Sequence, residues 1–172
     1  MCIQLKINYF AIFCNRILLQ VRPQKGNFRG DKMIYINDEH KQFYENKCKE
    51  ILKYRELISN YKAFIYTIGI CRDTRNNFKQ IYNIQKDRFD IEIFKSAWQT
   101  TGSMKVCRLA FNLLNGFCYD SDEDIEADKV SLQYTVAEIF ACGFAPYFIQ
   151  AIALRYPSYM KEDVNNDYKS NI

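Results

Sequence analysis

The side chain best suited to acid–base chemistry is His40, the only histidine in the chain. An imidazole can act as a general base near neutral pH, but catalysis also requires a positioned partner within hydrogen-bond reach. The sequence offers only the neighbouring Glu39. His40 also falls in the first turn of an expected helix, where the positive end of the helix dipole disfavours the protonated ring. We interpret His40 as a structural or exposed residue and keep an enzyme centred on it as a third hypothesis.

Thiols are the next candidate nucleophiles, and the chain has seven cysteines without a CxxC pair or a Cys/His cluster. Cys71 and Cys107 fall on apolar faces of expected helices, where thiols are usually inert. A secreted disulfide framework more often has an even number of cysteines in a short, loop-rich chain. We therefore expect reduced thiols that pack as small apolar side chains, and a cytoplasmic protein.

A run of acids, YDSDEDIEAD at 119–128, begins like an EF-hand calcium loop. Acids stand at the first, third and fifth positions, as calcium ligation requires. The sixth position, where the sharp turn needs Gly, is Ile125, and the twelfth, where a bidentate Glu belongs, is Ser131. We expect a solvated acidic loop rather than a metal site, and weak binding of a divalent ion stays open.

The same segment is the candidate for contact with a partner, because its charge can imitate a phosphate backbone and attract the basic groove of a nucleic-acid-binding protein. The residues assigned to this partner-binding site are Asp120, Asp122, Glu123, Asp124, Glu126 and Asp128. The chain contains no phosphate-binding loop, dinucleotide fingerprint, zinc-protease motif or hydrolase elbow. We therefore expect no catalytic residue, no cofactor and no metal.

The formal net charge of +4 suggests a nucleic-acid partner, but the position of that charge weakens the interpretation. Residues 1–32 carry six Lys or Arg against one acid, and the rest of the chain holds 18 basic and 19 acidic residues. The basic residues after Met33 are dispersed, so direct nucleic-acid binding is expected only if residues 1–32 serve as a basic arm. Such binding would weaken steeply with salt. It is the alternative function.

Residues 1–32 match neither a signal peptide nor a membrane span. Charged and amide side chains between positions 6 and 16 interrupt the apolar run, which excludes about 20 consecutive apolar residues. A helix lying on a membrane surface stays open, but we expect no membrane partner. Residues 29–33, RGDKM, can be encoded with a purine-rich ribosome-binding sequence just before an ATG codon. We expect Met33 to be the natural start, which the intact mass of the native protein would test.

Apolar residues at helical spacing dominate the chain after Met33, with Ser, Thr and Asn as starts and Gly or Pro as stops. Residues 89–98 suit a short helix or a loop fixed by aromatic side chains. The expected helices are 38–54, one from Ser59 or Asn60 to Asp73, a short one capped by Thr74, one capped by Ser103 and stopped by Gly116, one over 131–141, and one from Pro146 to Pro157. About six short helices predict a compact all-α bundle over 33–160, with a polar tail at 161–172.

Five stretches occur in an order that resembles one protein family: NDEHKQFYE (37–45), KAFIYTIGICRD (62–73), KQIYNI (79–84), VCRLAFNLLNGF (106–117) and IFACGFAPYFIQAIALRYP (139–157). That family consists of small uncharacterised helical proteins, described only as a domain of unknown function, from Gram-positive bacteria and their phages and mobile elements. The acidic 119–128 segment and residues 1–32 depart from the family pattern. The resemblance implies a fold and a genomic setting, and it implies no reaction.

The leading hypothesis combines the missing catalytic motifs with this genomic setting. We expect a non-enzymatic accessory protein of a phage or mobile element that binds a host or phage protein. An inhibitor of a host defence system is its most concrete form.

Overall fold

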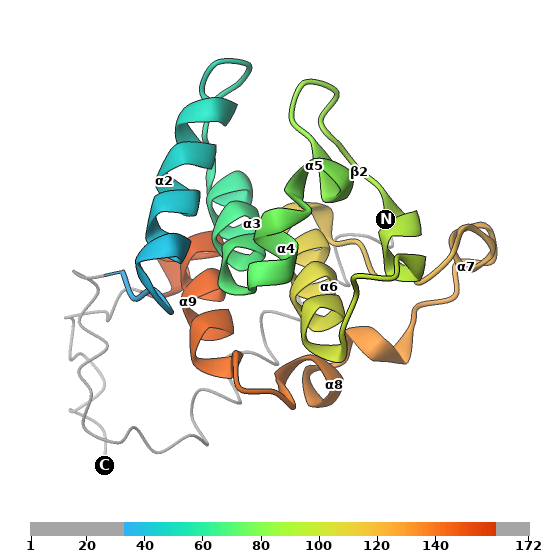
Figure 1. The fold of residues 1–172 in the computed structure, drawn as a ribbon. Helices are drawn as coiled ribbons and strands as arrows, with labels where there is room; N and C mark the ends of the chain where they lie inside the picture. The colour runs from blue at the N-terminus through green and yellow to red at the C-terminus, as the bar shows by residue number, and fades with distance from the viewer. Residues whose placement is uncertain (1–32, 161–172) are drawn as a thin grey trace, which may run out of the picture. The chain divides into compact units, whose positions relative to one another are not determined.

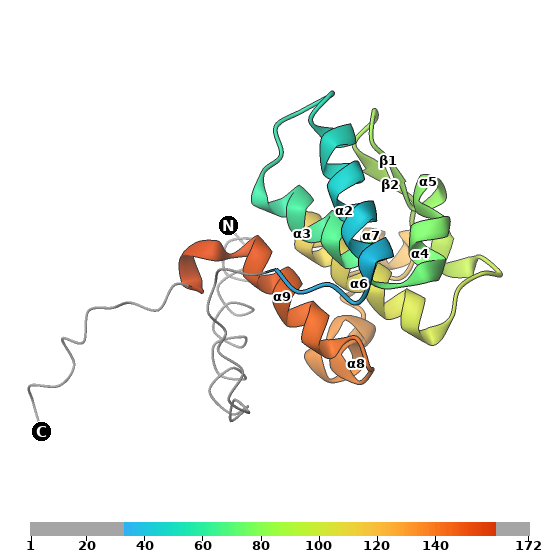
Figure 2. The same ribbon diagram turned by 60° about the vertical axis from the view of Figure 1, so that its left-hand side comes forward.

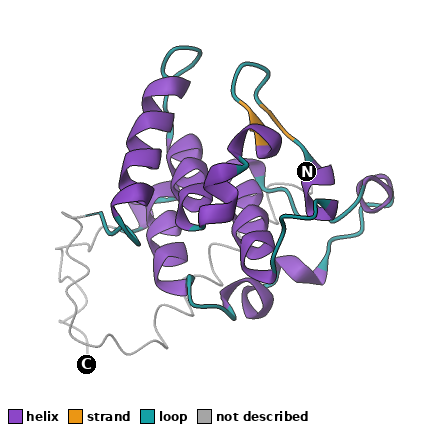
Figure 3. Cartoon of the chain, in the orientation of Figure 1, coloured by secondary structure: helices purple, strands orange, loops and turns teal. Residues whose placement is uncertain are grey.

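The computed structural model describes residues 33–160, and within them the chain is helical with one small hairpin (Figures 1 and 3). The all-α class is therefore confirmed for this part of the chain. The expectations for 1–32 and 161–172 lie outside the described residues. The elements in chain order are α2 (Asp38–Ile51), α3 (Ser59–Ile70), α4 (Arg72–Asn76), α5 (Phe78–Ile81), β1 (Tyr82–Asn83), β2 (Arg88–Phe89), η1 (Ile91–Lys95), α6 (Thr101–Asn115), α7 (Asp122–Glu126), η2 (Leu132–Tyr134), α8 (Val136–Phe140), α9 (Ala145–Arg155) and η3 (Pro157–Tyr159).

Helix α3 forms the core of the domain because residues 63–70 are buried on every side of it. It packs against α2, α6 and α9, and Figure 1 shows it between α2 and α6. A surface helix would keep a polar face, which this stretch lacks. Ile65 and Ile68 favour a strand by propensity, but packing on three helices decides for the helix that the sequence predicted.

Helix α6 begins with a capping box, in which two side chains satisfy each other's backbone groups. Thr100 is the N-cap: its hydroxyl accepts the Ser103 N–H at 3.1 Å, and the Ser103 hydroxyl accepts the Thr100 N–H at 2.7 Å. The prediction that Ser103 is the cap is therefore wrong by three positions. Gly116 ends the helix with φ 82°, the left-handed conformation expected of a glycine stop.

Four other expected boundaries are wrong. Helix α2 ends at Ile51 rather than at residue 54, and α3 ends at Ile70 rather than at Asp73. Thr74 lies inside α4, and its hydroxyl donates to the Ile68 carbonyl oxygen at 2.5 Å, so it satisfies the end of α3 instead of starting a helix. The single helix expected over 131–141 is divided into η2 and α8, because Thr135 takes an extended conformation and caps α8. At Thr74 and Thr135 a hydroxyl group satisfies backbone groups at a helix end, which helical spacing alone does not reveal.

The hairpin was not expected from the sequence. Strands β1 and β2 are antiparallel, with Tyr82 opposite Phe89 and Asn83 opposite Arg88, and Figure 2 shows them beside α5. Two residues per strand are too few for an alternating pattern to be recognised. The short helix considered for 89–98 is the 3₁₀ helix η1. No helix within 33–160 combines the length and the apolarity needed to cross a lipid bilayer.

Candidate functional site

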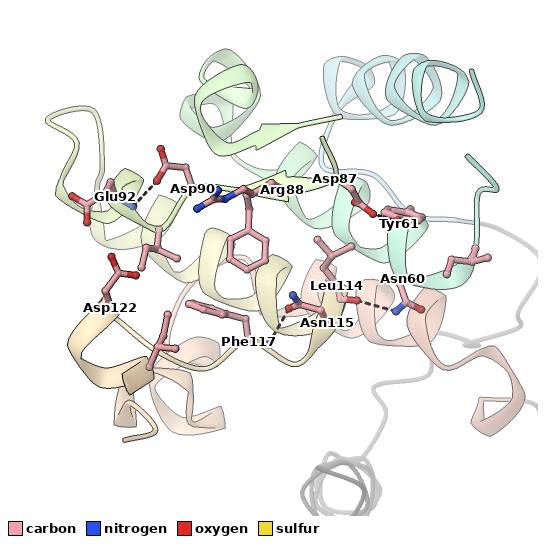
Figure 4. A pocket seen from close by; sticks show the side chains of 14 residues that line it. Asn60, Tyr61, Asp87, Arg88, Asp90, Glu92, Leu114, Asn115, Phe117 and Asp122 are labelled. Atoms are coloured by element: carbon pink, nitrogen blue, oxygen red, sulfur yellow. Dashed lines mark hydrogen bonds between the residues drawn. The ribbon is translucent and has the colours of Figure 1, made fainter. Parts of the chain in front are cut away.

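An open groove lies where the hairpin, the start of α3, the end of α6 and α7 meet (Figure 4). Its volume is about 520 Å³, which is in the range of ligand-binding clefts. The lining residues come from four separate parts of the chain, so the groove exists only in the folded domain. They are Ile58, Asn60, Tyr61, Asp87, Arg88, Phe89, Asp90, Ile91, Glu92, Leu114, Asn115, Phe117, Asp122 and Ile125.

The floor of the groove is apolar and rests on stacked aromatic rings. Phe89 stacks on the buried Phe111 with ring centroids 4.2 Å apart, and Phe117 meets the Phe89 ring edge-on at 5.0 Å. Such contacts hold the rings in place. Ile58 and Ile125 remain 43% and 41% exposed. A rigid floor with exposed apolar side chains is a surface from which a binding partner can remove water.

Hydrogen bonds between helices fix the base of the groove. The Asn60 side-chain amide donates to the Leu114 carbonyl oxygen at 2.8 Å, which ties the start of α3 to the end of α6. Arg155 Nε donates to the Leu113 carbonyl oxygen at 2.9 Å and brings α9 to the same helix end. The last carbonyl groups of a helix have no partner inside the helix. These two side chains satisfy two of them and hold the three helices in register.

Asp87 lies beside Tyr61 at one end of the groove (Figure 4). Its carboxylate accepts hydrogen bonds from the Tyr61 hydroxyl at 2.6 Å and from the Tyr82 hydroxyl, and it forms an ion pair with Arg55. Burial acts to raise the pKa of Asp87, but the two phenol hydrogen bonds and the Arg55 charge outweigh it and lower that pKa. With φ 54°, Asp87 also makes the left-handed step of the hairpin. Its charge is therefore used to hold the hairpin.

The other end of the groove carries acids whose charges are less engaged. Asp90 caps η1 by accepting the Glu92 N–H at 3.0 Å, and Glu92 forms an exposed ion pair with Lys95 at 2.9 Å. Asp122, the first residue of α7, makes no ion pair within the described residues. Arg88 is the one cation among the fourteen lining residues. An acidic rim of this kind attracts cations and repels phosphates.

Only Asp122 of the six acids expected to bind a partner lines the groove. Asp120 is instead half-buried, where it accepts from Arg108 Nε at 3.1 Å and from the Ser131 hydroxyl. Asp128 accepts from the Tyr119 hydroxyl at 2.7 Å. Asp120 and Asp128 therefore hold the acidic segment in its folded shape.

The remaining three acids, Glu123, Asp124 and Glu126, lie on α7 but outside the groove lining. Ser121 caps this short helix, so the segment is more ordered than the solvated loop that the sequence predicted. Hydrogen bonds from its own backbone N–H and from Ser121 lower the pKa of Glu123. Among residues 33–160, no group of three or more His, Cys, Asp or Glu side chains is placed to hold a metal ion.

His40 lies outside the groove and is fully buried. Its Nε2–H donates to the Tyr66 carbonyl oxygen at 2.8 Å, and its Nδ1 accepts the Ile36 N–H at 3.4 Å. Burial lowers the pKa of His40 to about 4, and the hydrogen bond to Tyr66 opposes this shift only in part. The ring is therefore neutral near pH 7, with both nitrogens bonded to the backbone. His40 has a structural role that joins α2 to α3.

The two candidate thiols are buried in the core, as expected. Cys71 is 8% exposed and Cys107 is fully buried. Burial raises the pKa of Cys107 to about 12, so its reactive thiolate form is strongly disfavoured. Phe111, on the same helix as Cys107, is also fully buried in the core.

Asp87, Asp90 and Glu92 were not recognised from the sequence as site residues. The signal that could have found them is the stretch KDRFDIE at 86–92, where charged residues alternate with Phe89 and Ile91. Alternation of this kind indicates a chain with one buried and one exposed side. The aromatic spacing, which favoured a short helix or a loop at 89–98, does not reveal this acidic side.

These observations define a small all-α domain with an exposed groove between its hairpin and its acidic segment. The chain belongs to the family of unknown function DUF6075, whose model matches residues 30–168. Its membership confirms the expected resemblance to an uncharacterised domain. No curated protein and no solved structure matches the chain.

Proposed function

We propose that this chain is a non-enzymatic accessory protein that acts by binding another protein. The observation that carries the proposal is the groove, because its apolar floor is exposed while its acidic rim orients a charged partner. The side chains with reactive chemistry, His40 and Cys107, are buried away from it and engaged in the fold. A rim with four carboxylates and one guanidinium also disfavours direct contact with nucleic acid.

The proposal includes a setting in a phage or mobile element, which is supported by the resemblance of the five sequence stretches. In its most concrete form the protein inhibits a host defence system by binding one of its nucleic-acid-binding proteins, whose basic surface would be attracted to the acidic rim. The proposal assigns the protein to the cytoplasm, where thiols stay reduced.

Affinity capture with the tagged full chain, from infected or lysogenic cells, tests this function. Three baits are compared: the unchanged protein, the double variant Ile58→Ser and Ile125→Ser, and the control Leu132→Ser. Leu132 is 78% exposed and does not line the groove, so its loss leaves the site intact. We expect one partner in a fixed ratio with the unchanged protein and the control, and at least tenfold less with the double variant. Failure of every bait to retain a partner would contradict the function.

A further inference from the structure

The two ends of the groove differ in how much charge they offer a partner. Asp87 at one end already accepts two phenol hydrogen bonds and pairs with Arg55. At the other end, Figure 4 shows Glu92 of η1 and Asp122 of α7 at the margin of the groove, which both residues line. Glu92 and Asp122 lie about thirty positions apart in the sequence, so the fold brings their charges together. The groove therefore has one neutralised and one acidic end.

The charges at the acidic end are accessible to an incoming cation. Asp122 makes no ion pair within 33–160, and the Glu92–Lys95 pair has both side chains mostly exposed, at 57% and 70%. An exposed pair of this kind is weak and can exchange partners. Arg88 projects beside Asp90 (Figure 4) and Lys95 pairs with Glu92, so three carboxylates stand against two cations at this end.

Between the two ends the groove presents apolar surface. Phe117 and Leu114 lie between the Glu92 end and the Asp87 end in Figure 4, and Ile58 and Ile125 add exposed aliphatic carbon. Covering this surface removes apolar area from water, which favours a branched or aromatic side chain over a polar one. A phosphate backbone does not match the acidic end of the groove, and a purely polar cation does not match its apolar middle.

We propose that the groove binds an extended segment of a partner protein in which an arginine or lysine stands within a few residues of a large apolar side chain. The cation lies at the end formed by Asp90, Glu92 and Asp122, and the apolar side chain lies over Phe117 and Leu114. This inference rests on the proposed function and specifies the chemistry of the partner. A polyamine is the competing ligand, but it would place a second cation at Asp87, whose carboxylate is already engaged.

Nuclear magnetic resonance of the ¹⁵N-labelled full chain tests the inference with defined probes. These are a peptide of alternating arginine and leucine, a second of alternating glutamate and leucine, a third of alternating arginine and serine, and spermidine. We expect the arginine–leucine peptide to shift amide signals of residues 87–92, 114–117 and 122–125. The other two peptides and spermidine should bind at least fivefold more weakly, because each lacks one of the two features.

Exposed side chains provide variants that leave the fold intact. Asp122→Asn combined with Glu92→Gln should weaken the arginine–leucine peptide fivefold or more, whereas Glu126→Gln, on the same short helix but outside the lining, should change its affinity less than twofold. Ile58→Ser should also weaken binding of the arginine–leucine peptide. Residue 58 is the N-cap of α3, where serine is favoured and no side chain now caps the helix, so this substitution should not destabilise the fold.

Three results would overturn the inference: equal binding of the glutamate–leucine peptide, equal binding of spermidine at the same residues, or signal shifts confined to another face. A partner that the capture experiment recovers equally with the groove variants would also overturn it. In that case the proposed function stands and only the assignment of the groove fails.

Discussion

Single residues in this domain show how burial turns reactive chemistry into structure. His40 is the one histidine of the chain, and the fold removes it from water and bonds both ring nitrogens to backbone groups. A buried imidazole resists protonation because the charged form loses its hydration. The residue that looked most catalytic in the sequence therefore makes the stability of the domain depend on pH.

The low pKa of His40 predicts loss of stability in mild acid. Its pKa is near 6.5 when unfolded and about 4 when folded, so the unfolded state binds more protons and is favoured as pH falls from 6.5 towards 4. Between pH 7 and pH 5 we expect the free energy of unfolding to fall by about 2 kcal/mol. Urea denaturation at both values measures this change. His40→Gln, which keeps a donor for Tyr66, should show little of it, and an unchanged wild type would contradict the prediction.

The close packing of His40 also requires a glycine at position 69. A Cβ at this position would lie 2.5 Å from His40 Cδ2 and 3.0 Å from Phe43 Cδ1. Neither ring can retreat, because His40 is bonded at both nitrogens and Phe43 packs edge-on against Phe78. We expect Gly69→Ala to lower the free energy of unfolding by about 1–3 kcal/mol. Denaturation midpoints measure this, with Gly143→Ala as a control because its Cβ would meet no atom within 4 Å. Equal midpoints for the two variants would show that the neighbouring side chains move to accept a methyl group at position 69.

At the scale of elements, long apolar patterns were predictable and polar details were not. The continuous apolar stretch of α3 and the stripe of α6 specify buried helices wherever they dock. The choice of Thr100 over Ser103 as N-cap depends on which side chain bends back to the backbone, and both residues are capable of it. The hairpin that forms one wall of the groove depends on Asp87 contacting Tyr61 and Arg55, which are distant in sequence. Local pattern could therefore indicate an acidic side at 86–92, but not the long-range contacts that place it beside the groove.

The folded shape of the acidic segment, residues 119–128, is expected to depend on the partly buried side chain of Asp120. Asp120 joins Arg108 on α6 to Ser131, while the Ser131 N–H donates to the Cys118 carbonyl oxygen at 3.0 Å and closes the segment. Asp120→Ala should accelerate hydrogen exchange of the Ser131 amide about tenfold. In this variant the segment can open locally without first breaking the contacts of Asp120 with Arg108 and Ser131. The amides of α3 should respond much less, and Glu126→Ala should leave Ser131 unaffected. Unchanged exchange at Ser131 in Asp120→Ala would mean that another contact holds the segment.

At the scale of the whole molecule, the groove and the core share one helix. Helix α3 supplies Asn60 and Tyr61 to the groove at its start and the fully buried core at its centre. It also packs against three other helices, so it cannot move without disturbing all of them. The groove is consequently expected to keep its shape as long as the core is folded, in accordance with the behaviour of small single domains.

This shared helix predicts a single cooperative transition that a core truncation shifts as a whole. Ile68 is fully buried at the centre of α3, and Ile68→Ala should cost about 2–5 kcal/mol through lost burial and a residual cavity. Trp98, the only tryptophan, donates to Gln80 near the hairpin, so its fluorescence reports on the groove side while circular dichroism reports on the helices. Both signals should shift together in Ile68→Ala and by less than about 0.5 kcal/mol in Leu132→Ala, which changes an exposed side chain. Two separated transitions in Ile68→Ala would instead show that the groove side unfolds independently of α3.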